Sequence, residues 1–201
     1  PARTAENLDE AVEKTEGEPV NWVMGLKNLD VAGLNVQFGN YNTPELKRGM
    51  DFNHLDFPDI NLNVDNIYYS VDRMAADLNK MSLKEKSGFQ VKNFTADITV
   101  DSTQAQLANL NLETGESIIR RHLAIGYPSL ATIADNINRL TINADMVNSK
   151  IGFRDLLYFQ PALADNPSFR SSLNKPLYVD GRVRGRVDNL RIERLQMAGL
   201  N

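Results

Sequence analysis

Apolar and polar residues alternate along most of the chain from Val20 onward. The segment FTADITV (94–100) places its apolar residues at every second position, with threonine and aspartate between them. Successive side chains of a strand point to opposite faces, so this pattern predicts antiparallel strands with one buried face and one wet face. The same alternation recurs in DINLNVDN (59–66), LANLNLET (107–114), LTINADMV (140–147) and GRVRGRV (181–187). In LANLNLET it predicts that Ala108, Leu110 and Leu112 share a face.

Turn-forming residues separate these segments at short intervals, as in KSGF (86–89), VDST (100–103) and ETGE (113–116). About nine to twelve strands fit this spacing. Two segments have helical spacing instead. PSLATIADNI (128–137) suits a short amphipathic helix, and RDLLYFQPAL (154–163) suits a single helical turn that stops near Pro161. The pattern predicts a largely all-β fold.

The first 19 residues differ in composition from the rest of the chain. They contain six acidic and two basic side chains, which accounts for the whole net charge of −4. We expect residues 1–19 to be an acidic flexible linker or insert, and residues 20–201 to be a single β-rich segment. The chain starts without methionine and ends in a strand-like segment, so we expect both parts to belong to a longer protein.

Charge and residue content argue against several classes of function. The 22 basic residues are outnumbered by 26 acidic ones, whereas a nucleic-acid-binding protein needs a basic excess to neutralise phosphates. The chain has no cysteine and no run of about 18 apolar residues that would span a bilayer. Its two histidines, His54 and His122, lie far apart, which predicts surface positions and no metal site.

Motifs for catalysis or calcium binding are not evident either. The alternating carboxylates and amides of residues 59–65 resemble a calcium loop, but Val64 stands where that loop needs glycine and Ser70 where it needs glutamate. We find no nucleophile elbow, zinc-protease motif or phosphate-binding loop. We therefore predict no enzyme activity and no cofactor; an enzyme using a pair of carboxylates stays the weakest alternative.

Arginine alternates with valine and glycine near the C-terminal end. Arg182, Arg184 and Arg186 would share one face of a strand that ends in a turn at residues 188–189. We interpret this stripe as the solvated face of the strand, because the long arginine stem also shields neighbouring sheet. The alternative is a site for anionic head groups or for an acidic partner, since the planar guanidinium can form two hydrogen bonds with one phosphate group.

Three segments together resemble a known family. They are LNKMSLKEKSGFQVKNFTADITVDSTQAQLANLNLET (78–114), NSKIGFRDLLYFQPAL (148–163) and VDGRVRGRVDNLRIERLQM (179–197). Their order is similar to that in the N-terminal half of TamB-like proteins of the Bacteroidota, which belong to the AsmA-like superfamily. The resemblance covers roughly residues 50–200, and the acidic start of the chain departs from it.

The resemblance implies a fold, a location and partners. It implies an elongated antiparallel β-groove, an open curled sheet, in the periplasm, tethered to the inner membrane by a helix outside this chain. It further implies outer-membrane biogenesis: an apolar groove for phospholipid acyl chains and/or outer-membrane protein assembly, with a TamA/BamA-type outer-membrane barrel as partner. No nucleic acid and no metal is expected.

The apolar positions of the alternating segments are the candidate lining of such a groove. They are Phe94, Ile98, Val100, Leu110, Leu112, Ile142, Val183, Val187 and Ile192. The alternative is that these residues form a closed core in a β-sandwich interaction module, adhesive or glycan-binding. Exposed apolar area separates the two hypotheses, because a sandwich hides its apolar faces and a groove exposes a long strip.

Overall fold

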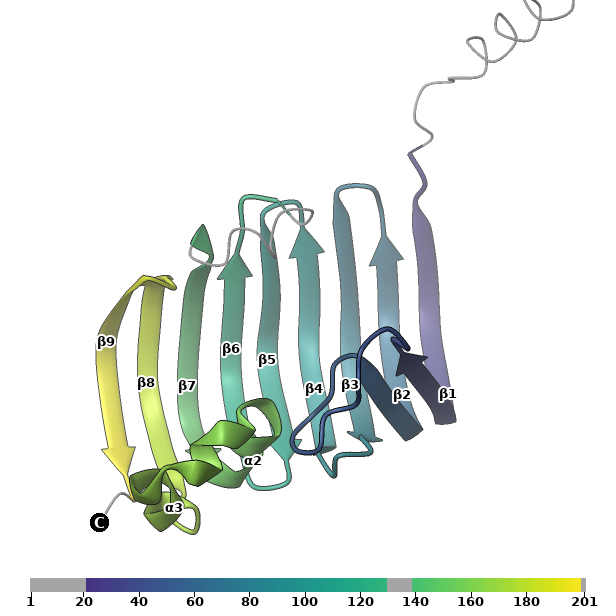
Figure 1. The fold of residues 1–201 in the computed structure, drawn as a ribbon. Helices are drawn as coiled ribbons and strands as arrows, with labels where there is room; N and C mark the ends of the chain where they lie inside the picture. The colour runs from purple at the N-terminus through teal and green to yellow at the C-terminus, as the bar shows by residue number, and fades with distance from the viewer. Residues whose placement is uncertain (1–20, 130–138, 200–201) are drawn as a thin grey trace, which may run out of the picture.

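The computed structural model describes residues 21–129 and 139–199. They form one open sheet of nine strands in sequence order, each antiparallel to the next (Figure 1). The strands are β1 (Met24–Gly39), β2 (His54–Tyr69), β3 (Arg73–Lys84), β4 (Gln90–Asp101), β5 (Gln104–Thr114), β6 (Ile118–Gly126), β7 (Thr141–Ile151), β8 (Leu177–Arg186) and β9 (Asn189–Ala198). The predicted all-β antiparallel fold is confirmed. The predictions for residues 1–19, and for the helix over most of 128–137, lie outside the described residues.

The only described helices lie between β7 and β8. They are α2 (Phe153–Phe159), the 3₁₀ helix η3 (Pro161–Asp165) and α3 (Pro167–Ser172). The short helix predicted for RDLLYFQPAL is confirmed: α2 ends before Pro161, whose ring excludes the preceding residue from a continuing helix. Asn166 starts α3 by accepting hydrogen bonds from the backbone N–H groups of Ser168 and Phe169.

Asparagines in the left-handed conformation mark three irregularities in the sheet. Asn66, Asn109 and Asn148 have φ values of 51°, 48° and 48°, and each lies where the pairing register shifts. Asparagine tolerates this conformation better than most residues. The side chain of Asn66 donates to Asp77 (2.7 Å) and that of Asn109 to Asp97 (2.6 Å), so two of the bulges are tied to the neighbouring strand.

The bulge at Asn109 changes which residues of β5 share a face. Strict alternation predicts Ala108 on the face of Leu110 and Leu112, and this is wrong. Ala108 lies opposite Asp97, and Leu107 lies opposite Ile98. The extra residue in the bulge reverses the alternation, so the apolar side chains on both sides of Asn109 reach the same face.

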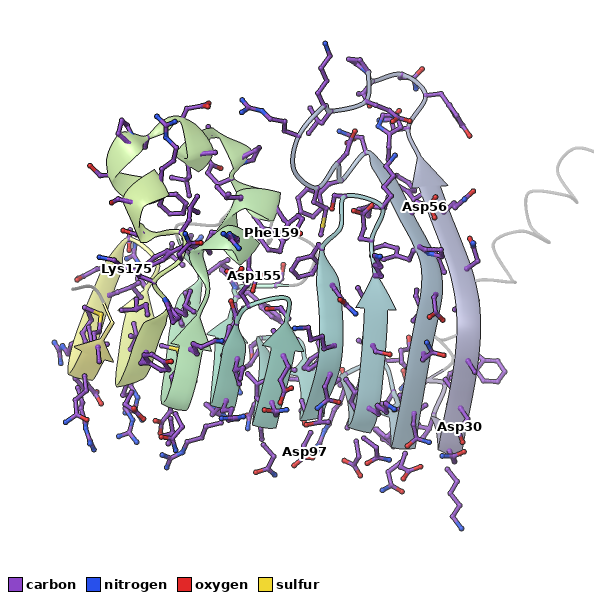
Figure 2. The ribbon with its side chains drawn as sticks, turned by 90° about the horizontal axis from the view of Figure 1, so that it is seen from below. Asp30, Asp56, Asp97, Asp155, Phe159 and Lys175 are labelled. Carbon is purple, nitrogen blue, oxygen red and sulfur yellow. The ribbon has the colours of Figure 1, made fainter. Side chains whose placement is uncertain are left out.

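The two faces of the sheet differ in what lies on them. In Figure 2, Asp30 and Asp97 point away from the side on which the helices, Asp155 and Phe159 lie. Asp65, Asp77 and Asp97 are direct neighbours across β2, β3 and β4 on the polar face. Side-chain amides of asparagines donate hydrogen bonds to these carboxylates. Asn28 (2.7 Å) and Asn79 (2.7 Å) both donate to Asp65.

The bulge account predicts unequal effects of two substitutions at one position. Asn109→Ala places a residue that disfavours the left-handed conformation there and removes the bond to Asp97, so we expect the free energy of unfolding to fall by about 1–2 kcal/mol. Asn109→Gly removes the same bond but accepts the conformation, so its loss should be clearly smaller. Urea denaturation of both variants measures this, and equal losses would contradict the backbone argument.

Candidate functional site

The strand register arranges apolar side chains in continuous rows across the sheet. Directly opposite residues of paired strands lie on one face, so each row follows from the pairing. A nine-strand row crosses the whole sheet: Met24, Tyr69, Met74, Val100, Ala105, Ile125, Ile142, Gly185 and Leu190. A seven-strand row lies beside it: Ala76, Ile98, Leu107, Leu123, Ala144, Val183 and Ile192. A six-strand row joins Val31, Leu62, Met81, Phe94, Leu112 and Ile119. These rows define the apolar face.

The structure brings together most of the residues predicted to line a groove. The nine-strand row contains Val100 and Ile142, the seven-strand row contains Ile98, Val183 and Ile192, and the six-strand row contains Phe94 and Leu112. Leu110 is buried and lies opposite Arg121.

Val187 does not take the predicted strand position. It lies in the turn between β8 and β9, where its N–H donates to the carbonyl of Leu140 (2.9 Å). The alternation of valines therefore ends with the strand at Arg186.

The candidate residues include none from the first three strands, although β3 contributes to all three rows and β1 and β2 contribute to two of them. The alternation in VAGLNVQF (31–38) was the available signal, but Gly33, with φ of 66°, interrupts it at a register shift. Exposure of the apolar face is greatest on the edge strands: Phe38 of β1 is 56% exposed and Ile192 of β9 is 57% exposed. Ala96 and Leu110 in the central strands are buried.

One end of the sheet is covered by a cap, formed by residues 40–53 and the helical segment 153–172. Figure 1 shows α2 and the segment between β1 and β2 in front of the same end of the strands. The Met50 N–H donates to the carbonyl of Tyr158 (2.6 Å). The ring of Phe89, from the β3–β4 turn, packs edge-on against Tyr158 and Phe159, with centroids 5.5 and 5.2 Å apart. The cap and a strand turn thus form one packed unit.

A buried carboxylate anchors α2 to the sheet. Asp155, in the first turn of α2, accepts hydrogen bonds from Thr114 Oγ1 (2.5 Å), from Ser117 Oγ (2.6 Å) and from the backbone N–H of Ser117 (2.8 Å) and Glu116 (3.1 Å). These donors belong to the β5–β6 turn. Four hydrogen bonds from fixed structural donors converge on its Oδ2, so Asp155 holds α2 against this turn.

A second buried carboxylate holds the β3–β4 turn. Glu85 is 1% exposed and accepts hydrogen bonds from the N–H groups of Asp56 (3.2 Å) and Ser87 (2.7 Å). Burial pushes the pKa of Glu85 upward, but the hydrogen bonds from Ser87 and its neighbours outweigh burial, and the pKa is lowered. Glu85 is therefore an ionised structural group.

The third buried carboxylate, Asp51, lies inside the cap. Its pKa is lowered, chiefly by the hydrogen bond from the Leu46 N–H and also by His54, whose Nδ1 lies 2.9 Å away. His54 is thus buried against a carboxylate, and its predicted surface position is wrong; His122 is partly exposed. No group of three or more potential metal-ligating His, Cys, Asp or Glu side chains occurs among residues 21–129 and 139–199.

The arginine stripe of β8 has partners on the polar face. Arg182 donates to Asp145 (2.9 Å), Arg184 donates to Asn143 (3.0 Å), and Arg186 donates to Asp188 (2.5 Å). The Arg182 bond lowers the pKa of Asp145. A pocket of about 460 Å³ beside them contains three arginines and three carboxylates among its lining residues: Arg121, Asp145, Asp180, Arg182, Glu193 and Arg194. Basic and acidic side chains are thus equal in number in this lining.

None of the helices in the described ranges is long and apolar enough to cross a membrane. Comparison of the chain with protein-family models, with curated proteins and with solved structures finds no match. The resemblance to TamB-like proteins therefore stays a prediction.

The lowered pKa of Glu85 predicts acid sensitivity. A group whose pKa is lower in the folded state stabilises the fold above its unfolded pKa, about 4.3 for glutamate, and this contribution is lost as the pH falls through the folded value. We expect the urea midpoint of the wild type to drop between pH 6 and pH 3. Glu85→Gln should be less stable at pH 6 and lose less on acidification. An identical pH dependence in both proteins would contradict a role for this carboxylate.

Proposed function

We propose that this chain is a periplasmic segment of an envelope-spanning protein, in which the apolar face holds phospholipid acyl chains. The observation that carries the proposal is the nine-strand row. It runs from β1 to β9 without a charged residue, and the described part of the chain supplies a covering layer only at the cap. A surface of this kind fits a long apolar ligand better than a compact polar one.

The energetics of acyl-chain burial favour such a ligand. Each buried methylene is worth about 0.8 kcal/mol, so half-burying one chain of about 16 carbons contributes roughly 6 kcal/mol. Binding of this kind does not need polar side chains that contact the ligand. The buried carboxylates of this chain instead stabilise the cap. Because the contacts along a row are similar to one another, a bound acyl chain can also shift its position, as transport requires.

The family resemblance supplies the biological setting of the proposal. TamB-like proteins suggest outer-membrane biogenesis, an inner-membrane tether outside this chain and a TamA/BamA-type barrel partner. Phospholipid transport and outer-membrane protein assembly both remain compatible with an apolar face that is open along its edges.

A closed β-module is the second candidate. The same rows would form a core if a second sheet, from another molecule or another part of a longer protein, packed on the apolar face. The half-buried state of the central strands is compatible with this arrangement. It predicts a protein partner and no bound lipid.

Adjacent residues of β4 provide a matched test of lipid binding. Ile98 lies in the seven-strand row, whereas Thr99 lies opposite Ala75 and Gln106 on the other face. We expect Ile98→Asp to remove most co-purified phospholipid, measured by native mass spectrometry and lipid extraction, because it places a charge among acyl chains. Thr99→Asp adds the same charge on the polar face and should keep the lipid.

A further variant separates lost binding from lost folding. Ile192→Asp changes a more exposed position of the same row, so it should keep the wild-type circular dichroism spectrum while also losing lipid. A folded wild-type protein that carries no lipid and takes up no fluorescent phospholipid would contradict the proposal and favour the closed module.

A further inference from the structure

A hollow of about 360 Å³ lies in the cap, between the helical segment and the segment that joins β1 to β2. We call it the cap pocket. Most of its lining consists of apolar side chains: Leu157, Tyr158, Pro161, Ala164 and Leu173. None of its lining residues belongs to the three rows of the apolar face. The cap pocket is therefore separate from the surface that we propose for phospholipid.

Backbone contacts hold the walls of the cap pocket in place. Gly49 has a φ of 79°, and a Cβ atom at this position would lie 2.9 Å from the carbonyl oxygen of Tyr158. Glycine thus permits the close approach in which the Met50 N–H donates to that carbonyl (2.6 Å). The Tyr158 hydroxyl also donates to the carbonyl of Gly88 (3.2 Å). Three segments that are distant in the sequence are therefore joined around the pocket.

The size and the lining of the cap pocket fit a small, mainly apolar ligand. Ligand pockets have volumes of about 300–1,000 Å³ and a mostly apolar lining with a few polar groups that orient the ligand. The cap pocket lies near the lower end of this range, which suits one acyl chain better than the two chains of a phospholipid. Leu157 and Leu173 are only half-buried, so a ligand would remove apolar surface from water.

The charged side chains that line the cap pocket are both cationic. They are Arg48 and Arg154, and no carboxylate occurs among the described residues of the lining. Arg48 pairs with Asp165 at 3.3 Å, and Arg154 pairs with Glu116 at 3.2 Å. Both arginine side chains are more than half exposed, and ion pairs in such surroundings contribute little to stability. An anionic group of a ligand can therefore compete for these guanidinium groups.

A more polar hollow of about 350 Å³ adjoins the cap pocket. The two hollows share Arg48, Gly49 and Ser87, so Arg48 lies where apolar and polar surroundings meet. The lining of the second hollow contains three cations and two carboxylates: Lys47, Arg48, Lys86, Glu45 and Asp51. An apolar hollow beside a polar one with an excess of cations suits an amphiphile with an anionic head.

We propose that the cap pocket binds a single-chain amphiphile with an anionic head, the chemistry that a fatty acid and an alkyl phosphate share. The alkyl chain would lie against the apolar lining, and the head would contact Arg48. The pocket thus adds a second kind of ligand site to the chain, distinct in place and in ligand size from the apolar face.

The test compares ligands that have the same dodecyl chain length and different heads. Isothermal titration calorimetry measures the binding of dodecanoate, dodecyl phosphate and dodecyltrimethylammonium, each below its critical micelle concentration. We expect both anions to bind and the cation to bind at least about tenfold more weakly. The anion that binds more tightly identifies the head that the site prefers.

Two tryptophan substitutions in η3 locate the binding. Ala164→Trp fills the pocket and should weaken binding of both anions about tenfold or more. Ala162→Trp adds the same side chain at an exposed position that does not line the pocket, so it should bind both anions like the wild type. Circular dichroism checks that both variants are folded.

An arginine substitution tests the role of the head without filling the pocket. Arg48→Gln should weaken binding of both anions about three- to fivefold and should not weaken binding of the cation. The matched control is Arg170→Gln, which removes an exposed cation of α3 outside the pocket and should leave all affinities nearly unchanged.

Equal binding of the anions and the cation would overturn the proposal, and so would unchanged anion binding in the Ala164→Trp or the Arg48→Gln variant when it is folded. Position 164 lies outside the rows of the apolar face, so the phospholipid content of Ala164→Trp should match that of the wild type. Ile98→Asp should in turn keep its binding of dodecanoate. The two ligand sites can therefore fail independently.

Discussion

A β-sheet with one apolar face is stable only when that face is shielded from water, and the described part of this chain supplies such a shield only at one end. The inner strands β2 to β8 are paired on both sides in one antiparallel ladder, so they need no second sheet for hydrogen bonding. The apolar rows remain accessible toward the edges, where Phe38 and Ile192 are more than half exposed. The proposed binding of acyl chains would shield these rows from water.

The cap shows how the one covered end is held. Asp51, Glu85 and Asp155 are buried carboxylates, and each accepts hydrogen bonds from a turn or loop that would otherwise leave polar groups unsatisfied. Structural donors occupy both oxygens of Asp51, both oxygens of Glu85 and the Oδ2 of Asp155. Polar chemistry in this molecule therefore organises the end of the sheet, and apolar chemistry dominates its open face.

Alternation predicted the antiparallel strands, because a period of two is a local property of the chain. Seven of the nine candidate residues also fall in the apolar rows. Alternation failed where the period breaks. The bulge at Asn109 exchanged Ala108 for Leu107, and the turn after Arg186 took Val187 out of the strand. The buried pairing of His54 with Asp51 depends on how residues 40–53 fold back over the sheet, and no local pattern contains that information.

The most direct test asks whether lipid touches one face of the sheet and not the other. The chain has no cysteine, so Met74→Cys on the apolar face and Ala75→Cys on the polar face each provide a single site for an environment-sensitive fluorophore. The measurement is quenching by phospholipid that carries a nitroxide on its acyl chain. The account predicts strong quenching at position 74 and little at position 75. Equal quenching at both positions, or none at position 74, would contradict it.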